Sequence, residues 1–207
     1  STDKAAGPIN LYGATKLTSD KIFTSANLFK GKKNSIFSVV RYGNVMGSRG
    51  SVLQIFLKQK KNNIFTLTDK RMTRFNISLS DAIKFVFKVE KIMNGGEIFV
   101  PKIPSFRVVD LIKAISNKPK FKIIGIRPGE KIHEEMISLS DSQNTIELKN
   151  CYLLLPSLTK DILKKYKKKF NAKLVKKNFT YSSNKNTKFL SIKELKKLIL
   201  DYQKYKL

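Results

Sequence analysis

The sequence predicts an α/β fold, in which short buried strands alternate with longer helices. Several runs of about four to seven β-branched and aromatic residues are typical of buried strands, and stretches with apolar residues at helical spacing lie between them. Glycine-rich or strongly polar segments separate the two kinds of element. With 207 residues, 41% of them apolar, the chain can form a folded core in one or two domains.

The first half of the chain follows this alternation. A polar turn at residues 31–34 ends the first helix, and a strand comes directly after it. Ser80 or Asp81 can cap the third helix, and its apolar residues occur on most of its faces, so we expect it to be largely buried. In chain order, the expected elements are helix 11–29, strand 36–42, helix 52–61, strand 64–68, helix 80–93 and strand 97–100.

The second half ends in a lysine-rich region. Residues 164–169 form a dense charge run, typical of a solvated helix face or tail, and Ser191 with Glu194 forms a capping-box pattern that begins a final helix. His133, the only histidine, is expected in a helix beside two glutamates and in a structural role, and no Cys/His cluster predicts a metal site. The other expected elements are a strand entry with a helix at 106–116 and strands at 121–126 and 146–155.

The composition bounds the classes of function. A net charge of +27 would attract nucleic acid or an anionic membrane surface. Only six of the 42 basic residues are Arg, however, and Arg is the usual bidentate reader of guanine and phosphate, so we favour a compositional lysine bias over specific nucleic-acid binding. The sequence contains no apolar run of about 18 residues, so it predicts no membrane-spanning helix. The single cysteine, Cys151, excludes an internal disulfide and suits the reducing cytoplasm.

The first sixteen residues carry the strongest chemical pattern. Tyr12 and Lys16 are four residues apart, which places both side chains on one helix face. An ammonium beside a phenol favours the phenolate and lowers the tyrosine pKa, as a general base for an alcohol requires. Asp3 and Lys4 supply a carboxylate and an amine that can both transfer protons, and Thr2 adds a hydroxyl.

Two loops after predicted strands have the composition of ligand-binding segments. Residues 43–51 contain three glycines, which allow backbone to approach a ligand at the carboxyl end of a strand. The turn Arg127–Glu130 offers a guanidinium for a diphosphate and a carboxylate for ribose hydroxyls. Arg74 is a further candidate to pair with a phosphate.

The string S-T-D-K-A-A-x-P-x-N-x-Y-G-A-T-K at residues 1–16 resembles the active-site segment of the extended short-chain dehydrogenase/reductases. It is most similar to that of the UDP-N-acetylglucosamine 4,6-dehydratases. The resemblance covers residues 1–157 strongly and the last third weakly, and the family commonly has an aromatic residue where this chain has Asn76. The supporting motifs, in the order that the family has them, are Arg41–Val45, Gly47–Val52, Met72–Phe75 and Arg127–Glu134.

For the architecture, the resemblance implies the C-terminal part of a doubly wound, NAD(P)-binding Rossmann fold with a smaller α/β substrate domain. No G-x-x-G-x-x-G motif occurs, so we expect the dinucleotide-binding half to lie upstream and the chain alone to be inactive. The implied division is residues 1–44 and 76–100 in the Rossmann domain, 45–75 and 101–157 in the substrate domain, and 158–207 in a lysine-rich extension with a terminal helix.

For the chemistry, the resemblance implies NADP, or else NAD, as cofactor and UDP-N-acetylglucosamine as substrate. Tyr12 would take the C4 hydroxyl proton, Lys16 would hold the nicotinamide ribose, and both would contact the cofactor. Thr2 would hydrogen-bond the sugar, and Asp3 and Lys4 would divide the acid and base work of the elimination of water. The implied substrate contacts are Arg41, Asn44, Arg49, Arg74, Arg127 and Glu130.

The resemblance also indicates a stereochemical class. Large membrane-anchored relatives that retain the C5 configuration commonly have Met where this chain has Tyr12, so we expect the soluble, inverting class of the pseudaminic acid pathway. A cytoplasmic homo-oligomer without membrane attachment is implied. The alternatives are a retaining 4,6-dehydratase, a UDP-sugar 4-epimerase, for which Asp3 and Lys4 would be idle, and, from another class, a basic nucleic-acid-binding protein.

Overall fold

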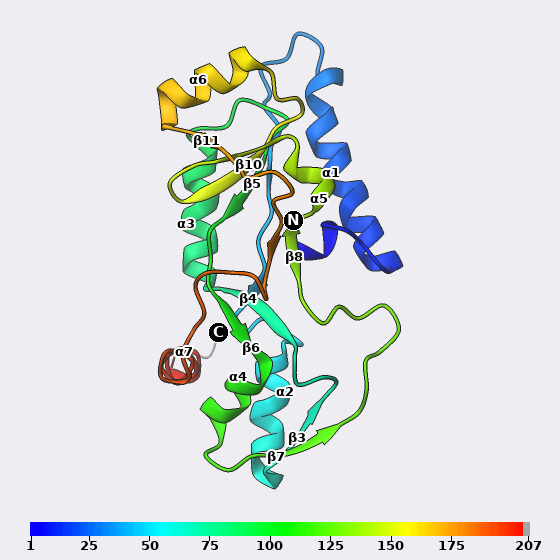
Figure 1. Cartoon of the computed structure of the whole chain (residues 1–207), viewed down its shortest axis with the longest axis vertical. Helices are drawn as coiled ribbons and strands as arrows, with labels where there is room; N and C mark the ends of the chain where they lie inside the picture. The colour runs from blue at the N-terminus through cyan, green and yellow to red at the C-terminus, as the bar shows by residue number, and fades with distance from the viewer. Residues whose placement is uncertain (205–207) are drawn as a thin grey trace. The chain divides into compact units, whose positions relative to one another are not determined.

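The computed structural model describes residues 1–204 and divides into two compact units (Figure 1). The last three residues of the predicted lysine-rich extension, 205–207, lie outside the described residues. Each unit is assembled from three separate segments of the chain. Unit 1 comprises Ser1–Tyr42, Ser80–Lys102 and Glu135–Ser182, and unit 2 comprises Gly43–Leu79, Ile103–Glu134 and Ser183–Leu207.

Unit 1 contains a five-stranded sheet with the strand order β1-β5-β10-β9-β11. Strand β1 is parallel to β5, with Val39 opposite Ile98, and the remaining pairs are antiparallel. A separate antiparallel pair joins β12 to β8. The strands are β1 (Val39–Val40), β5 (Ile98–Pro101), β8 (Glu135–Ile137), β9 (Thr145–Glu147), β10 (Cys151–Leu154), β11 (Lys173–Leu174) and β12 (Tyr181–Ser182).

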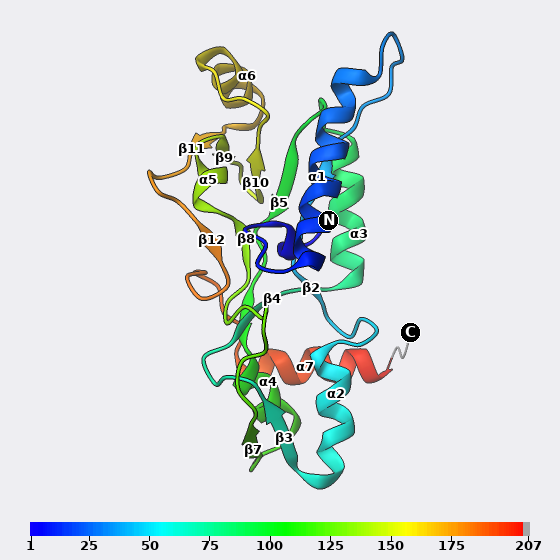
Figure 2. The same ribbon diagram turned by 90° about the vertical axis from the view of Figure 1, so that its right-hand side faces the viewer.

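Helices surround the strands of unit 1 (Figures 1 and 2). In the core, Phe99 and Leu153 of the sheet pack with Val89 and Tyr166 of two of these helices. Burial of such side chains is the main stabilising contribution to a fold of this size. The helices are η1 (Asp3–Ala5), α1 (Leu11–Phe29), α3 (Leu79–Glu90), α5 (Leu139–Ser142) and α6 (Lys160–Phe170).

The start of α1 is fixed by local interactions. The Asn10 side chain accepts a hydrogen bond of 2.8 Å from the Gly13 amide, which satisfies one of the free N–H groups at the helix end. A Cβ atom at Gly13 would lie 2.7 Å from the Lys4 carbonyl oxygen and 2.9 Å from Cβ of Pro8. Glycine therefore lets α1 begin directly against the 3₁₀ turn that carries Lys4.

Unit 2 contains a three-stranded sheet, β2-β4-β6, and a parallel pair, β3-β7. Its core is formed by α2, α4 and α7 with β3, and Phe56, Leu111, Ile112 and Leu195 are its central side chains. The last helix, α7, packs on α4 (Figure 2). The elements are β2 (Asn44–Val45), α2 (Val52–Gln59), η2 (Lys60–Asn62), β3 (Ile64–Leu67), β4 (Thr73–Ile77), β6 (Ser105–Arg107), α4 (Val108–Ile115), β7 (Lys120–Ile123) and α7 (Ile192–Lys204).

These elements confirm the predicted α/β class. The predicted helices and strands occur with shifts of a few residues at their ends, except that the region 146–155 forms two antiparallel strands, β9 and β10. Two expectations were wrong. Helix α3 is not largely buried, because Ala82 and Val89 are its only fully buried residues, whereas Phe87 is 60% exposed. His133 does not lie in a helix, since it forms an isolated β-bridge with Thr73.

The division of the chain also differs from the expected one. Residues 135–157 fall in unit 1, because β9 and β10 add to the sheet next to β5. The region 158–207 is shared between the units, with residues 158–182 in unit 1 and the segment from Ser183 onward in unit 2. The extension is therefore an integral part of both folds.

Candidate active site

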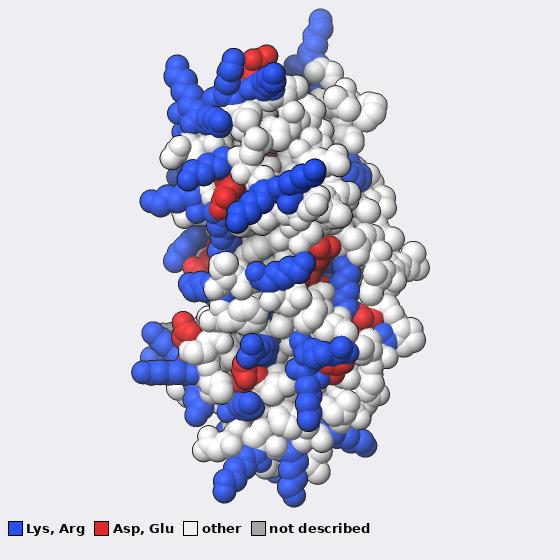
Figure 3. Space-filling view, viewed as in Figure 1, with Lys and Arg blue, Asp and Glu red and all other residues white. Residues whose placement is uncertain are grey.

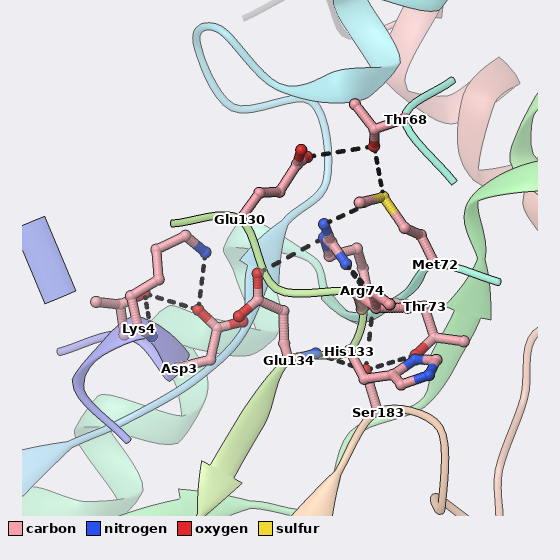
Figure 4. Close-up of polar contacts among 12 residues, drawn as sticks. Asp3, Lys4, Thr68, Met72, Thr73, Arg74, Glu130, His133, Glu134 and Ser183 are labelled. Atoms are coloured by element: carbon pink, nitrogen blue, oxygen red, sulfur yellow. Dashed lines mark hydrogen bonds and ion pairs between the residues drawn. The ribbon is translucent and has the colours of Figure 1, made fainter. Parts of the chain in front are cut away.

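In unit 1, the predicted acid–base residues lie on the short turn η1. The Asp3 amide donates to the Tyr42 carbonyl, which anchors this turn to the strand that leads into Tyr42. The Asp3 side chain is 1% exposed, and its Oδ1 accepts from Thr2 Oγ1 at 2.9 Å and from Lys4 Nζ at 3.0 Å (Figure 4). Its Oδ2 is buried without a hydrogen-bond partner among the described residues, so one carboxylate oxygen remains available to accept a proton.

Tyr12 and Lys16 share a face of α1 as their spacing predicts. The Lys16 ammonium lies over the Tyr12 ring, 5.2 Å from its centroid, which is a cation–π contact rather than a bond to the hydroxyl. Tyr12 is 57% exposed and Lys16 is half-buried. The exposed tyrosine can therefore reach a bound molecule.

Unit 2 contains a pocket of about 250 Å³. Apolar side chains such as Phe56 form part of its wall. A cavity of this size accommodates part of a nucleotide-sized ligand. Four of the six predicted substrate contacts line it, namely Asn44, Arg74, Arg127 and Glu130.

Arg74 is fixed in this pocket by its neighbours on unit 2. Its guanidinium donates to the carbonyls of Thr73 and Ile132, at 2.7 and 2.9 Å, and its Nε lies 3.6 Å from Glu134 Oε1 (Figure 4). The side chain is only 12% exposed. These contacts fix the guanidinium at the wall of the pocket.

Arg127 and Glu130 close a tight turn beside the pocket. The Glu130 amide donates to the Arg127 carbonyl at 3.0 Å, and Gly129, at φ +73°, occupies the position of a type II turn that favours glycine. The Glu130 carboxylate accepts from the Arg127 amide at 3.2 Å and from the Thr68 hydroxyl at 3.4 Å. Thr68 also lines the pocket but was not predicted to do so. Its position directly after a predicted strand is the sequence feature that could have indicated it.

His133 belongs to a hydrogen-bonded cluster in unit 2 rather than to the pocket. Thr73 Oγ1 lies 2.8 Å from His133 Nδ1 and 2.6 Å from Ser183 Oγ, and Ser183 Oγ accepts from the Glu134 amide at 2.9 Å (Figure 4). Burial lowers the pKa of His133, and the positive charge of Arg74 contributes in the same direction. Both effects favour the neutral imidazole. The hydroxyl of Thr73, shared between His133 and Ser183, links the C-terminal segment to β4.

Two predicted substrate contacts do not line the pocket. Arg41 is 1% exposed and its guanidinium is bound to Asp20 and Asp141, so it is a structural residue of unit 1, which corrects the expectation of a substrate contact. Arg49 lies exposed in the glycine-rich loop after β2, outside the pocket wall.

The described residues contain no group of three or more His, Cys, Asp or Glu side chains that could hold a metal ion. Within the same part of the chain, no helix is long and apolar enough to cross a membrane.

The hydroxyl of Tyr12 and the ammonium of Lys16 are a donor set that fits the ribose of a dinucleotide cofactor.

The family model described as "Polysaccharide biosynthesis protein" matches residues 1–156, which include η1, α1 and the pocket. The chain belongs to this family. Membership covers both the Asp3–Lys4 turn and the loop that carries Arg127. Two dTDP-glucose 4,6-dehydratases, each 13% identical, are among the structures that share its fold, with TM-scores of 0.57 and 0.59.

Two curated relatives of the chain are named for different reactions. The chain is 50% identical to the UDP-N-acetylglucosamine 4,6-dehydratase (inverting) of Campylobacter jejuni subsp. jejuni serotype O:2, over 96% of this chain and 61% of that protein. It is 37% identical to the UDP-glucose 4-epimerase of Rickettsia bellii, over 97% and 60%. The chain thus spans about 60% of the length of the curated relatives it matches.

A solved structure is similar to the chain in both sequence and fold. The X-ray structure of Pen from Bacillus thuringiensis is 37% identical and superimposes with a TM-score of 0.81, covering 98% of this chain and 61% of that one. At this similarity the backbone of both units is shared along the described chain.

Proposed function

We propose that the protein to which this chain belongs converts UDP-N-acetylglucosamine by 4,6-dehydration with inversion at C5. The observation that carries the proposal is the pair formed by Asp3 and Lys4, whose side chains meet at 3.0 Å in a chain 50% identical to an enzyme named for this reaction. An acid–base pair is what loss of water across C5–C6 requires.

In the proposed oxidation at C4, Tyr12 accepts the hydroxyl proton. Lys16, whose ammonium is held against the Tyr12 ring, contacts the ribose of the cofactor and keeps positive charge beside the phenolate that accepts this proton. NADP, or else NAD, supplies the hydride acceptor when it is bound. The ketone formed at C4 makes the neighbouring C5 proton acidic.

Asp3 and Lys4 divide the elimination that follows. One of them takes the C5 proton, and the other donates a proton to the C6 hydroxyl as it leaves as water. The resulting enone then regains the hydride at C6 and a proton at C5, on the face opposite to the one deprotonated, which balances the oxidation at C4 and inverts C5. The hydrogen bond between their side chains couples the two transfers. Thr2, which donates to Asp3, orients that carboxylate and lies next to the proposed sugar site.

The pocket of unit 2 is proposed to bind the nucleotide part of the substrate. Arg74 and Arg127 supply positive charge for the diphosphate, and Glu130 accepts from the ribose hydroxyls. Asn44 lies at the edge that β2 contributes. Arg49 is retained as a proposed contact from the glycine-rich loop, where it is exposed.

The finer assignments belong to the same proposal. We propose NADP rather than NAD, a place early in pseudaminic acid biosynthesis, and a cytoplasmic location, with which the single buried Cys151 is compatible. A homo-oligomer is also proposed, because the resemblance to the family implies one.

The test uses the complete enzyme, meaning this chain together with the dinucleotide-binding region that its resemblance implies. Incubation with UDP-N-acetylglucosamine and NADP should give a product lighter by one water. Proton NMR in D₂O should show couplings of the L-arabino 4-ulose, with deuterium at C5. A product with only the D-xylo configuration would contradict the inverting assignment.

Tyr12→Phe in the complete enzyme should lower kcat by about 10²-fold or more, because the C4 hydroxyl proton loses its acceptor. Substrate affinity should change little. Tyr152→Phe, in β10, is the matched control and should retain normal turnover. Near-normal turnover of the Tyr12→Phe enzyme would exclude the proposed role of Tyr12.

UDP-sugar 4-epimerisation is the second candidate, because the chain is 37% identical to an enzyme of that name. An epimerase needs Tyr12 and Lys16 but has no elimination step, so Asp3→Asn and Lys4→Met would leave its rate nearly unchanged. A product of unchanged mass with an altered C4 configuration would support this alternative.

A further inference from the structure

The Thr68 hydroxyl lies against the Glu130 carboxylate at the wall of the unit 2 pocket. Both residues line this pocket, and their side chains point toward each other (Figure 4). Thr68 follows β3 directly, whereas Glu130 belongs to the turn after β7, 62 residues further along the chain. Both side chains are half-buried, so a molecule in the pocket can contact either of them.

Each oxygen of the Glu130 carboxylate accepts a hydrogen bond from unit 2. Oε2 accepts from the Arg127 amide at 3.2 Å, and Oε1 accepts from the Thr68 hydroxyl at 3.4 Å. A carboxylate offers about four acceptor positions, so each oxygen can take a further donor from a ligand. One acceptor position on each of two oxygens, about 2 Å apart, suits two neighbouring hydroxyls such as those of a ribose.

The Thr68 hydroxyl has a second acceptor beside it. Its Oγ1 lies 2.9 Å from Met72 Sδ (Figure 4), but a hydroxyl carries a single hydrogen to donate. A thioether is a weak acceptor, and a hydrogen bond to an ionised acceptor is about twice as strong as one between neutral groups. The carboxylate of Glu130 is therefore the favoured acceptor, while Met72 fixes the position of the Thr68 oxygen.

We propose that Thr68 is a positioning residue, whose hydroxyl holds the Glu130 carboxylate in the orientation that accepts both ribose hydroxyls of the nucleotide. This inference rests on the proposed function, in which Glu130 accepts from the ribose. Without the Thr68 donor, the carboxylate keeps the Arg127 amide on Oε2 and can turn about that bond. A ribose would then lose much of its advantage over a ribose that lacks one hydroxyl.

The test titrates the complete enzyme with UDP and with 2′-deoxy-UDP by calorimetry. Wild type should bind UDP about tenfold more tightly, since the site is built to hydrogen-bond the missing hydroxyl. Thr68→Val keeps the shape of the side chain without its donor. It should raise the Kd for UDP about three- to fivefold and change the Kd for 2′-deoxy-UDP less, so that the preference falls to about two- to threefold. Thr68→Ser, which retains the hydroxyl, should restore most of the preference.

A matched control removes another hydroxyl of the same unit. Ser116 Oγ donates to Asn63 Oδ1 at 2.6 Å, and neither residue lines the pocket. Ser116→Ala should therefore leave both Kd values and their ratio unchanged. Thermal unfolding of each variant accompanies the titrations, because a merely structural role of Thr68 would lower the Tm and weaken both nucleotides equally, without changing the ratio.

Two results would overturn the inference. One is a wild-type preference for UDP in Thr68→Val, and the other is an equal loss of affinity for both nucleotides. If Thr68→Val does not fold, Thr68→Ala is measured in the same way. Failure of the wild-type enzyme to bind UDP, or to prefer it over 2′-deoxy-UDP, would instead refute the proposed nucleotide site, so the two failures are distinguishable.

Discussion

The Arg41 side chain joins three parts of unit 1 through a single guanidinium. Its Nε and one terminal nitrogen donate to Asp20 Oδ2 of α1 at 3.1 and 2.9 Å. The other terminal nitrogen donates to the Met136 carbonyl at 3.0 Å and to Asp141 Oδ2 at 3.3 Å. The burial of both Arg41 and Asp20 means that either charge without the other would be left in a poorly solvated site.

Asp20→Ala should therefore lower the free energy of unfolding by about 3–5 kcal/mol, the usual cost of removing one partner of a buried ion pair. Asp110→Ala is the control, because Asp110 forms a loose surface pair with Lys113 at 3.9 Å and should cost less than about 1 kcal/mol. Urea denaturation of both variants measures the difference. Equal losses would show that the Arg41 contact contributes no more than a surface pair.

At the scale of elements, α7 supports the glycine-rich loop that borders the pocket. Gln54 Nε2 donates to the Tyr202 hydroxyl at 3.0 Å and to the Gly47 carbonyl at 3.3 Å, and the Gly50 amide donates to Gln54 Oε1 at 3.2 Å. The Tyr202 ring occupies the space where a Cβ atom at Gly47 would be. Because Gly50 lines the pocket, the terminal helix helps to set the shape of the proposed nucleotide site.

Gly47→Ala tests this packing, because the added methyl group meets the Tyr202 ring and the backbone is at φ +76°. Gly31→Ala is the matched control, with φ +60° and no atom within 4 Å of the added carbon. Backbone strain costs both variants about 1 kcal/mol, and the collision should cost Gly47→Ala about 1–3 kcal/mol more.

Combining Gly47→Ala with Tyr202→Ala completes the double-mutant cycle. The double variant should lose less stability than the sum of the two single variants, because the ring that causes the collision is absent. Additive losses would show that Tyr202 does not pack on Gly47 as described.

At the scale of the whole molecule, charge is the most unusual property. Lys and Arg side chains occur over most of the face seen in Figure 3, with a smaller number of Asp and Glu among them. In α6, the lysines lie around an apolar side that packs Tyr166 into the core of unit 1. This arrangement is that of a solvated helix face, which favours compositional bias over a dedicated nucleic-acid site.

We therefore expect weak, sequence-independent retention of the protein on double-stranded DNA that is lost near physiological salt. Each phosphate contact contributes to a steep fall of log affinity with log salt concentration, and no arginine cluster adds base readout. Filter binding across a salt series, with a scrambled duplex beside each test duplex, measures this. Nanomolar, sequence-dependent binding at physiological salt would support the nucleic-acid-binding alternative.

Local patterns in the sequence predicted local structure well. The capping box of Ser191 and Glu194 forms as expected, with the Glu194 amide 3.2 Å from Ser191 Oγ, because all its atoms lie within one helical turn. The i,i+4 spacing likewise placed Tyr12 and Lys16 together. Such arguments depend on neighbouring residues alone, so the rest of the fold cannot change them.

Long-range pairings were beyond such patterns. Nothing near Arg41 in the sequence indicates that Asp20 and Asp141 would take its guanidinium, so its substrate role was predicted from motif resemblance and not from its surroundings. The meeting of Asn44 with Asn76 depends on the register of two strands, and the pocket depends on loops far apart in the chain. The exposure of α3 depended on which of its faces the sheet covers, which periodicity alone does not reveal.

The interleaving of the two units has a consequence for biosynthesis on the ribosome. Leu53, near the start of unit 2, shares a core with Leu195 and Ile199 of the last helix. That core cannot close until the segment that contains Leu195 and Ile199 has been translated, since its contacts join the most distant segments of the unit. Until then the apolar side chains of the earlier segments lack part of their core and are exposed to aggregation.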